Sequence, residues 1–388
     1  MKNKICKIVM YALISIFFSI NFLSAQIEQA QKVIESQMKR TSAQELGRWV
    51  YITGFYMSAQ YRIYKETANE NYLQYIKDWI DDHVNDEGVI DRDIWSLDNC
   101  QPGLATLYLY QETGEKKYKR AVDHIRDTIK TFPRTSDGGF HHDTAKKGQL
   151  WLDGVYMALP FLVSYGQAFN DTTCYTEAAN QIIIYASHLK DENTGLLYHA
   201  YDEDGSEDWA DNPDHRSHCF WGRSMGWFGM AIVDILDYIP ANHPKRAQLI
   251  EILSDLVEGV AQFQDEQSGL WYQLVDQPDN PDNWLETSCS SMYTYFTAKA
   301  VEKGYVPERF RNVAVRGYEG ILQHKLSVDE NGLANLKDVT RGTMARIDCD
   351  YYLQRPRETN DLHGLGAFIM MCSQMAKMPD LKQHKYKF

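Results

Sequence analysis

A turn signature returns along this chain, and its spacing constrains the fold more than any other feature of the sequence. In each copy an Asp stands a few residues before a Gly and apolar residues follow, at 85–90, 136–142, 191–200, 265–274 and 329–336. The copies are roughly 50 to 75 residues apart, which is longer than most solenoid repeats and suits a long helical hairpin with its loops. The chain is therefore predicted to be a series of helical hairpins.

Two kinds of helix alternate around these turns. Before each turn the segment is amphipathic, with apolar residues three and four apart and charges between them, as expected for an outer helix. After each turn the segment is rich in Gly, Ala, Ser and Met and apolar on most sides, as expected for a buried inner helix. The outer segments are 72–84, 118–132, 175–189, 247–263 and 310–326, and the inner ones are 97–114, 149–169, 222–239, 287–304 and 362–377.

With two further helices over 27–39 and 43–66, this alternation predicts an all-α (α/α)6 toroid, built as a single domain over residues 26–388. Alternating antiparallel helices make all inner helices run in the same direction. Their N-termini, with the loops that lead into them, therefore meet on one rim, and we expect the functional residues there.

Residues 1–25 predict a secretory signal peptide. Three lysines precede an apolar run over 8–22, and small residues precede a predicted cut after Ala25. The apolar run is short for a membrane span and lacks a basic flank behind it. Because Gln26, and not Cys, follows the cut, we expect no lipid anchor, and a periplasmic or secreted mature protein with no membrane anchor.

Charge and cysteine spacing exclude several classes of partner. The net charge of −13 repels polyanions and leaves no basic tract for nucleic acid, so an acidic ligand has to be held locally by one or two placed cations. Of the 7 cysteines, Cys6 lies in the leader, and the others show neither CxxC nor CxxH spacing. We expect most of them to be buried free thiols and none to bind a metal.

Two aspartates stand at the starts of inner helices. Asp153 has bulky apolar neighbours in WLDGVYMALPFL, which predicts a raised pKa suited to a general acid, although a charge that favours the helix N-terminus is the alternative. Asp98 opens the preceding inner helix, where ordinary N-capping is an equally good explanation. On a shared rim, Asp98 is a candidate partner that keeps Asp153 protonated through repulsion of like charges.

Three histidines follow the turns that lead to the same rim. His141 and His142 follow the second turn and His199 follows the third, so they occupy equivalent repeat positions. A lone histidine is usually structural, but beside two carboxylates these are better explained as ligands of sugar hydroxyl or carboxylate groups. A metal site is the alternative, and the lack of any short ligand spacing argues against it, so we expect neither a metal nor a cofactor.

The remaining candidates belong to the fourth and sixth inner helices and the loops before them. Trp221, Arg223 and Trp227 fall in FWGRSMGWFGM, where core packing is the alternative for the tryptophans and a buried Arg needs an anion from the protein or from a substrate. His363 ends a long polar loop, 340–364, that also carries Tyr352 and several charged residues. Surface salt bridges explain any one of those charged residues equally well.

These motifs together resemble glycoside hydrolase family 105, the unsaturated rhamnogalacturonyl hydrolases, and the related family 88, the unsaturated glucuronyl hydrolases. The resemblance covers essentially the whole chain after the leader. It rests on LDN at 97–99, GGFHH at 138–142, the helix that begins at Asp153, His199 after its turn, FWGRSMGW at 220–227 and DLHGLGAF at 361–368.

The resemblance implies an (α/α)6 barrel without a metal, acting on a short acidic oligosaccharide that a polysaccharide lyase has produced. It implies Asp153 as general acid and base and Asp98 as its carboxylate partner. The acid protonates C4 of a C4=C5 double bond in the terminal uronic acid, water adds at C5, and the hemiketal falls open. The residues implied to contact the substrate are His142, His199, Trp221, Arg223 and Trp227.

Two adjacent positions depart from the family pattern. Many members read GRGNGW where this chain has Ser224 and Met225. The departure leaves the chemistry intact but bears on which sugar stands next to the uronate. The sequence leaves open whether the substrate comes from rhamnogalacturonan, an ulvan-like sulfated glycan or a glycosaminoglycan.

Two other functions fit the same residues. A conventional inverting glycosidase on the same toroid would place two carboxylates on either side of an intact bond, with room for water. An exported glycan-binding protein is the non-enzymatic alternative, although proteins of that type usually carry a lipidated cysteine where this chain has Gln26.

Overall fold

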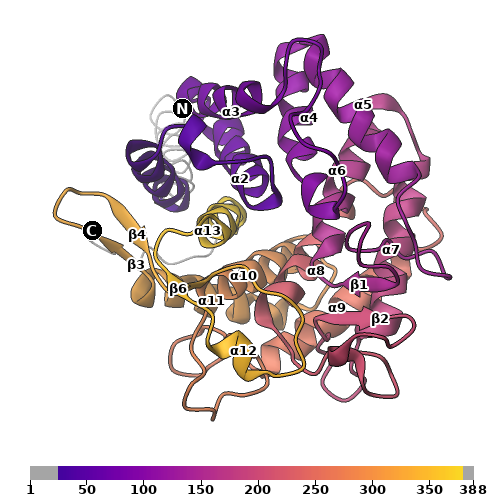
Figure 1. Ribbon diagram of the computed structural model, residues 1–388. Coiled ribbons are helices and arrows are strands. Elements are labelled where there is room, and N and C mark those ends of the chain that lie inside the picture. The colour runs from indigo at the N-terminus through magenta and orange to yellow at the C-terminus, as the bar shows by residue number, and fades with distance from the viewer. Residues whose placement is uncertain (1–24, 379–388) are drawn as a thin grey trace, which may run out of the picture.

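The computed structural model describes residues 25–378, which form alternating inner and outer helices (Figure 1). The inner helices are α2 (Tyr51–Thr67), α4 (Pro102–Thr113), α6 (Gly154–Phe169), α8 (Gly222–Ile235), α10 (Thr287–Glu302) and α13 (Leu362–Met375). The outer helices are 25–40, α3 (Glu70–His83), α5 (Lys116–Lys130), α7 (Thr173–Leu189), α9 (Arg246–Gln262) and α11 (Arg311–His324). A short helix, α12 (Asp350–Leu353), lies in the loop before α13.

The inner helices close a complete ring. Each packs against the next one along the chain, from α2 through α4, α6, α8 and α10 to α13, and α13 packs back against α2. Every outer helix from α3 onward packs against the inner helix that precedes it. The predicted all-α (α/α)6 barrel is therefore confirmed.

Composition separates the two kinds of helix. In α5 the buried side chains recur three and four residues apart from Tyr118 to Ile129, and most of the charged ones lie on the other face. In α8 every residue of the helix is buried. Glycine allows the close approach that this burial requires, because a Cβ at Gly226 would lie 2.7 Å from Sδ of Met292 in α10.

Short extended segments tie the loops together at the inner-helix N-termini. Three antiparallel pairs are formed. They are β1 (Gln149–Trp151) with β2 (Ala200–Asp202), β3 (Leu326–Val328) with β4 (Ala334–Leu336), and β5 (Val339–Thr340) with β6 (Arg357–Glu358). Because β1 and β2 come from successive repeats, the pair fixes side chains of one repeat against those of the next.

One disulfide crosses the same end of the barrel. Cys219, shortly before α8, is bonded to Cys349, the residue before α12, across 130 residues of sequence. The remaining cysteines of the described chain are buried free thiols, as predicted for most of them. The sequence alone did not indicate the disulfide.

None of the helices described is both long and apolar enough to cross a membrane. The predicted signal peptide, residues 1–25, lies outside the described residues except for its last position.

Candidate active site

Asp98 and Asp153 lie at the barrel rim without acting as helix caps. Asp98 is in a 3-10 turn (Leu97–Asn99), and the N-cap of the following α4 is Gln101. Asp153 holds the N-cap position of α6, yet its side chain makes no capping hydrogen bond. Capping, which the sequence left open for Asp98, is therefore not its role, and both carboxyls are available for chemistry.

One histidine side chain lies beside each of the two carboxyl groups. His142 Nε2 lies 3.9 Å from Asp98 Oδ1, and His199 Nε2 lies 3.5 Å from Asp153 Oδ1. Both imidazoles are buried, whereas the side chains of Asp98 and Asp153 remain 26% and 15% exposed. Residues from three successive repeats thus meet at one place, as the shared rim predicts.

Backbone hydrogen bonds between adjacent repeats bring these aspartates and histidines together. The residue before each aspartate donates its N–H to the carbonyl oxygen of the corresponding histidine, Leu97 to His142 at 3.1 Å and Leu152 to His199 at 2.9 Å. These bonds fix the backbone from which each imidazole extends relative to the backbone of its aspartate.

Trp151 lies between the two imidazoles. Its ring stacks on that of His142, with centroids 4.8 Å apart, and meets the His199 ring edge-on at 5.6 Å. The indole is 5% exposed, and Nε1 donates to Gln149 Oε1 at 3.0 Å. Trp151 therefore packs against both imidazoles and restricts their movement.

The surroundings push the pKa values of the two carboxyls apart. Burial raises the pKa of Asp98 to about 6, and the charge of Asp153 adds to the effect while His142 opposes it. Burial also raises the pKa of Asp153, but the contact with His199 and the charge of His142 outweigh it and lower that pKa to about 2. When the pair carries a single proton, that proton therefore lies on Asp98.

The prediction of a raised pKa for Asp153 is wrong in its direction. Apolar neighbours along α6 do bury the carboxyl, as the sequence shows. The group that reverses the shift is His199, which reaches Asp153 from the next repeat.

Several buried polar atoms at this place have no hydrogen-bond partner within residues 25–378. They are Asp98 Oδ1, Asp153 Oδ1, His142 Nδ1 and His199 Nε2. Buried polar groups are almost always paired, so a concentration of exceptions marks a place where a ligand completes the hydrogen bonding.

The two carboxyls lie close together. Asp98, His142 and Asp153 each offer one atom within 4.8 Å of the others. An inverting glycosidase keeps its carboxyl groups roughly 6.5 to 9.5 Å apart, and the approach of one Asp98 oxygen to one Asp153 oxygen within 4.8 Å favours a closer pair. The same three groups could ligate a divalent cation, and the absence of a metal from the working site stays a prediction.

Trp221 and Arg223 form a buried pair beside His199. The ring of Trp221 lies 4.6 Å from that of His199, and the Arg223 guanidinium lies over the indole at 4.8 Å. Arg223 donates to the carbonyl oxygens of Thr340 and Arg341, and its Nε is buried without a partner in the described part of the chain. Its predicted contact with a substrate carboxylate stays a prediction.

Two other predicted substrate residues make contacts that hold the protein together. Trp227 is 1% exposed and lies in the core of the barrel. Its ring centroid is 4.6 Å from that of Phe55 and 4.9 Å from that of Tyr156. His141 accepts the N–H of Gly148 on Nε2 and is not part of the carboxyl cluster. A substrate contact from either residue stays a prediction.

His363 belongs to a hydrogen-bonded chain of its own at the start of α13. Its Nδ1 lies 2.6 Å from Asp361 Oδ1, and its Nε2 lies 2.7 Å from the hydroxyl of Tyr51. A proton donated from Nδ1 to the carboxylate leaves Nε2 to accept from the tyrosine. Tyr51 opens α2 and was not predicted from the sequence, because nothing near it along the chain resembles a site.

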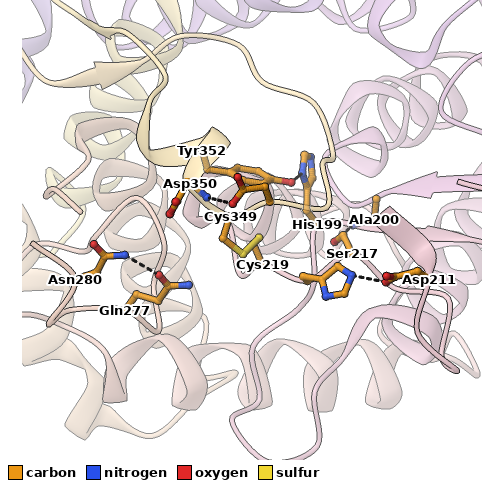
Figure 2. Close-up of a disulfide and its surroundings, with 12 residues drawn as sticks. His199, Ala200, Asp211, Ser217, Cys219, Gln277, Asn280, Cys349, Asp350 and Tyr352 are labelled. Carbon is orange, nitrogen blue, oxygen red and sulfur yellow. Dashed lines mark hydrogen bonds and ion pairs between the residues drawn. A yellow bond between two sulfur atoms is a disulfide. The ribbon is translucent and has the colours of Figure 1, made fainter. Parts of the chain in front are cut away.

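Tyr352 lies in the long polar loop before α13, and the structure brings it to His199. Its hydroxyl lies 2.8 Å from Nδ1 of His199 (Figure 2). The other ring nitrogen, Nε2, is the one that approaches Asp153. Tyr352 is fully buried, three residues after the disulfide-bonded Cys349. No local signal could have found this contact, because it joins residues 153 positions apart.

Comparison with known proteins covers nearly the whole described chain. The model of Glycosyl Hydrolase Family 88 matches residues 25–379. The unsaturated rhamnogalacturonyl hydrolase YesR of Bacillus subtilis is 27% identical over 357 residues, which are 90% of this chain and 96% of that protein. An unsaturated 3S-rhamnoglycuronyl hydrolase of an Alteromonas species is 21% identical over 368 residues, 92% of this chain and 83% of that protein.

A solved structure extends the similarity to three dimensions. A family 105 glycoside hydrolase of C. acetobutylicum is similar with a TM-score of 0.85 and 32% sequence identity, over 89% of this chain and 98% of that one. The whole helical ring is therefore shared with that protein.

Proposed function

This chain belongs to glycosyl hydrolase family 88, with family 105 among its structural relatives, and on that premise we propose that it removes a 4,5-unsaturated uronic acid from the non-reducing end of short oligosaccharides. The chain is a glycoside hydrolase, as predicted, of the unsaturated glucuronyl and rhamnogalacturonyl hydrolase group. The reaction we propose is hydration of the C4=C5 double bond, after which the sugar falls away.

The observation that carries this proposal is the close, proton-sharing pair of Asp98 and Asp153. Hydration of a vinyl ether needs one acid to protonate carbon and a base to accept a proton from water. A pair with one carboxyl of pKa about 6 and the other of about 2 provides both in mildly acidic solution. Its spacing, within 4.8 Å, disfavours the alternative of an inverting glycosidase.

The proposed steps return the pair to its starting state. The shared proton goes to C4, and the positive charge that develops at C5 is stabilised by the ring oxygen. Water adds to C5, and the doubly ionised pair takes up one of its protons. The hemiketal at C5 opens to a ketone, and the hemiacetal left at C1 expels the next sugar. One water is consumed for each uronate released.

We propose a rhamnose-containing oligosaccharide, from rhamnogalacturonan or an ulvan-type glycan, as the substrate. The support is that the B. subtilis relative is an unsaturated rhamnogalacturonyl hydrolase and the Alteromonas relative is an unsaturated 3S-rhamnoglycuronyl hydrolase. A net charge of −13 favours a short acidic chain held at its end over a long polyanion.

Ser224 and Met225, where many family members have Gly and Asn, are packed inside the protein. Both are fully buried, Ser224 Oγ donates to Trp221 O at 2.8 Å, and Met225 Sδ contacts Leu197 N at 3.3 Å. The departure therefore affects the packing of α8 and is a weak guide to the neighbouring sugar.

The first test uses lyase-generated oligosaccharides from rhamnogalacturonan, ulvan and a glycosaminoglycan, with loss of the enoate ultraviolet absorbance as the readout. We expect turnover of the rhamnose-containing products to exceed that of the glycosaminoglycan product. Matched saturated oligosaccharides serve as controls, and turnover of these would favour a conventional glycosidase.

The second test follows the proton. Turnover in heavy water should place deuterium at C4 of the released keto sugar, because the proton shared by the pair exchanges with solvent. A product without carbon-bound deuterium would exclude hydration whatever the substrate.

We also propose that the protein is exported, to the periplasm or beyond the cell, after removal of residues 1–25. The support is the leader sequence together with the Cys219–Cys349 disulfide, since disulfides persist in oxidising compartments and are rare in the bacterial cytoplasm. Mass spectrometry of the protein from its native host tests the cut: a mature N-terminus at Gln26 supports export, and an intact leader contradicts it.

A further inference from the structure

Residues 341–356, which we call the loop wall, run between β5 and β6 and carry α12 across the barrel rim (Figure 2). The backbone of the loop wall is held to the barrel at few points near the site. Arg223 donates to Arg341 O at 3.1 Å, and Gln273 Nε2 donates to Tyr352 O at 3.1 Å. The third attachment is the disulfide to Cys219. The loop wall therefore owes its position to contacts distant in sequence.

The disulfide lies within the same small cluster as the site side chains. Cys219, Trp221, Leu274, Tyr352 and Leu353 form one buried apolar cluster, against which Cys349 packs. Tyr352 N donates to Cys349 O at 3.0 Å, so α12 is a short and stiff connection between the disulfide and the tyrosine. A bond that fixes Cys349 therefore fixes the hydroxyl of Tyr352 as well.

That hydroxyl determines which nitrogen of His199 carries the proton. His199 is fully buried, and burial lowers its pKa, so the ring is neutral and has one N–H. If Tyr352 donates to Nδ1, the N–H lies on Nε2 and points to the carboxylate of Asp153. The other tautomer would direct an Nε2 lone pair at a negative charge, which is unfavourable.

We propose that Tyr352 is a positioning residue for the catalytic pair, acting on Asp153 through the Nε2–H tautomer of His199, and that the Cys219–Cys349 disulfide holds it in place. The structural part of this proposal concerns a hydrogen-bonded chain and stands apart from the substrate. Its kinetic consequence rests on the proposed function, because only turnover reports the base strength of Asp153.

Other charged or titratable groups also act on Asp153, and each comes from a different element. They are Asp98 and His142 from the two preceding loops, Tyr51 from α2, Tyr185 from α7, and the His199 and Tyr352 chain. A Tyr352→Phe substitution leaves all of these groups in place except the hydroxyl of Tyr352. A change in the acid–base behaviour of Asp153 in that variant is therefore a change transmitted through His199.

The first experiment reads the tautomer and needs no substrate. Protein labelled with 15N-histidine is compared with Tyr352→Phe by NMR, and a His199→Gln variant identifies the signal. We expect Nε2 protonated and Nδ1 unprotonated in the wild type, and a mixture of tautomers in Tyr352→Phe. A wild-type ring protonated on Nδ1, or a signal unchanged by Tyr352→Phe, overturns the proposal.

The second experiment measures turnover of the unsaturated oligosaccharide that the wild type accepts best. We expect Tyr352→Phe to lower kcat about 10-fold with KM within about 2-fold, since a partner behind a reacting group tunes it without touching the substrate. The acidic limb of the pH profile should move to higher pH, because the ionised form of Asp153 loses support. Tyr351→Phe, the neighbouring ring of α12, is the matched control and should behave as wild type.

An unchanged kcat and pH profile in Tyr352→Phe would overturn the proposal even if the tautomer shifts. If the wild type turns over none of the oligosaccharides, the proposed function fails, while the NMR result still decides the Tyr352–His199 chain. The two failures are therefore distinguishable.

The disulfide is tested with a double variant, Cys219→Ser with Cys349→Ser, against a control that removes a distant buried thiol, Cys174→Ala. We expect the double variant to lower kcat several-fold and to give mixed His199 tautomers. Adding Tyr352→Phe should then lower kcat by less than about 2-fold more, because both changes break one chain. Full additivity, or a double variant with wild-type tautomer and kcat, would contradict the role of the disulfide.

Discussion

The two sides of the barrel rim hold their site residues by different means. On the repeat side, formed by the turns before α4, α6 and α8, the groups are fixed by backbone hydrogen bonds between adjacent turns, Leu97 to His142 and Leu152 to His199. On the side of the loop wall, Tyr352 is fixed by a disulfide and by side-chain contacts that span more than a hundred residues. Changes on the repeat side should therefore alter the chemistry, and changes beside the loop wall should alter position and stability.

The largest effect is expected on the repeat side, for Asp153→Asn. The amide keeps the shape of the carboxylate but can neither carry the transferred proton nor accept one from water. We expect turnover to fall about 1,000-fold or more at every pH, with thermal stability and product binding nearly retained. Kinetics across the pH range and calorimetry of product binding measure both, and substantial residual turnover would remove Asp153 from the chemistry.

Asp98→Asn should be severe at neutral pH and partly rescued by acid. Without Asp98 the proton has to rest on Asp153, whose pKa of about 2 lies far below neutrality. We expect about a 100-fold loss at pH 7 that shrinks as the pH falls. Turnover measured from pH 4 to pH 8 tests this, and a loss that stays constant with pH would contradict a proton shared by the pair.

Arg223→Ala tests the other side of the comparison, because Arg223 holds the start of the loop wall through two carbonyl oxygens. Removing two charge-assisted hydrogen bonds should lower the free energy of unfolding by about 3 kcal/mol. If Arg223 also binds the uronate, affinity for product falls as well, and Arg223→Lys, which lacks the planar fork, is damaged less than Arg223→Ala. Melting temperature and product affinity are measured on the same variants.

A folded Arg223→Ala variant with near-normal product affinity would remove Arg223 from the substrate site and leave it a purely structural contact of the loop wall. A variant with normal stability and lost affinity would instead contradict its role in holding residues 340 and 341.

The stability of Asp98→Asn should depend on pH with a defined sign. The folded pKa of Asp98 is raised to about 6 from an unfolded value near 4, so its contribution to stability is fully present below pH 4 and is lost as the pH rises through 6. Asn does not ionise, so the variant loses no stability in this way as the pH rises. The variant should therefore gain about 2 to 3 kcal/mol over wild type between pH 4 and pH 8.

Urea unfolding at several pH values measures this gain, with Asp279→Asn, on the exposed surface, as the control. A difference between Asp98→Asn and wild type that does not grow with pH would contradict the raised pKa.

The smallest effect is expected for Ser224→Gly, which restores the residue common in the family. Because Ser224 is fully buried and bonds only within α8, KM for substrates with different neighbouring sugars should change by less than about 2-fold. A larger, sugar-dependent change would show that this position selects the substrate after all.

Much of the repeat side could be predicted from the sequence. The turn signature and the alternation of amphipathic and apolar helices predict the ring, and a ring of parallel inner helices requires Asp98, His142, Asp153 and His199 to face one rim. The roles were harder to assign. Trp227 packs in the core of the ring. His141 accepts from Gly148 instead of joining His142, because side chains next to each other along an extended segment point to opposite sides.

The sequence by itself determined the ring and the convergence of two carboxyls and their histidines, since both follow from local periodicity and from the direction of the helices. Only the tertiary structure decided that Asp98 has the higher pKa of the two carboxyls, that Cys219 is bonded to Cys349, and that Tyr352 contacts His199. A pKa depends on every charge and on the solvent that surrounds a group in space, and a disulfide depends on where two distant segments meet. Neither quantity is encoded in the spacing of residues along the chain.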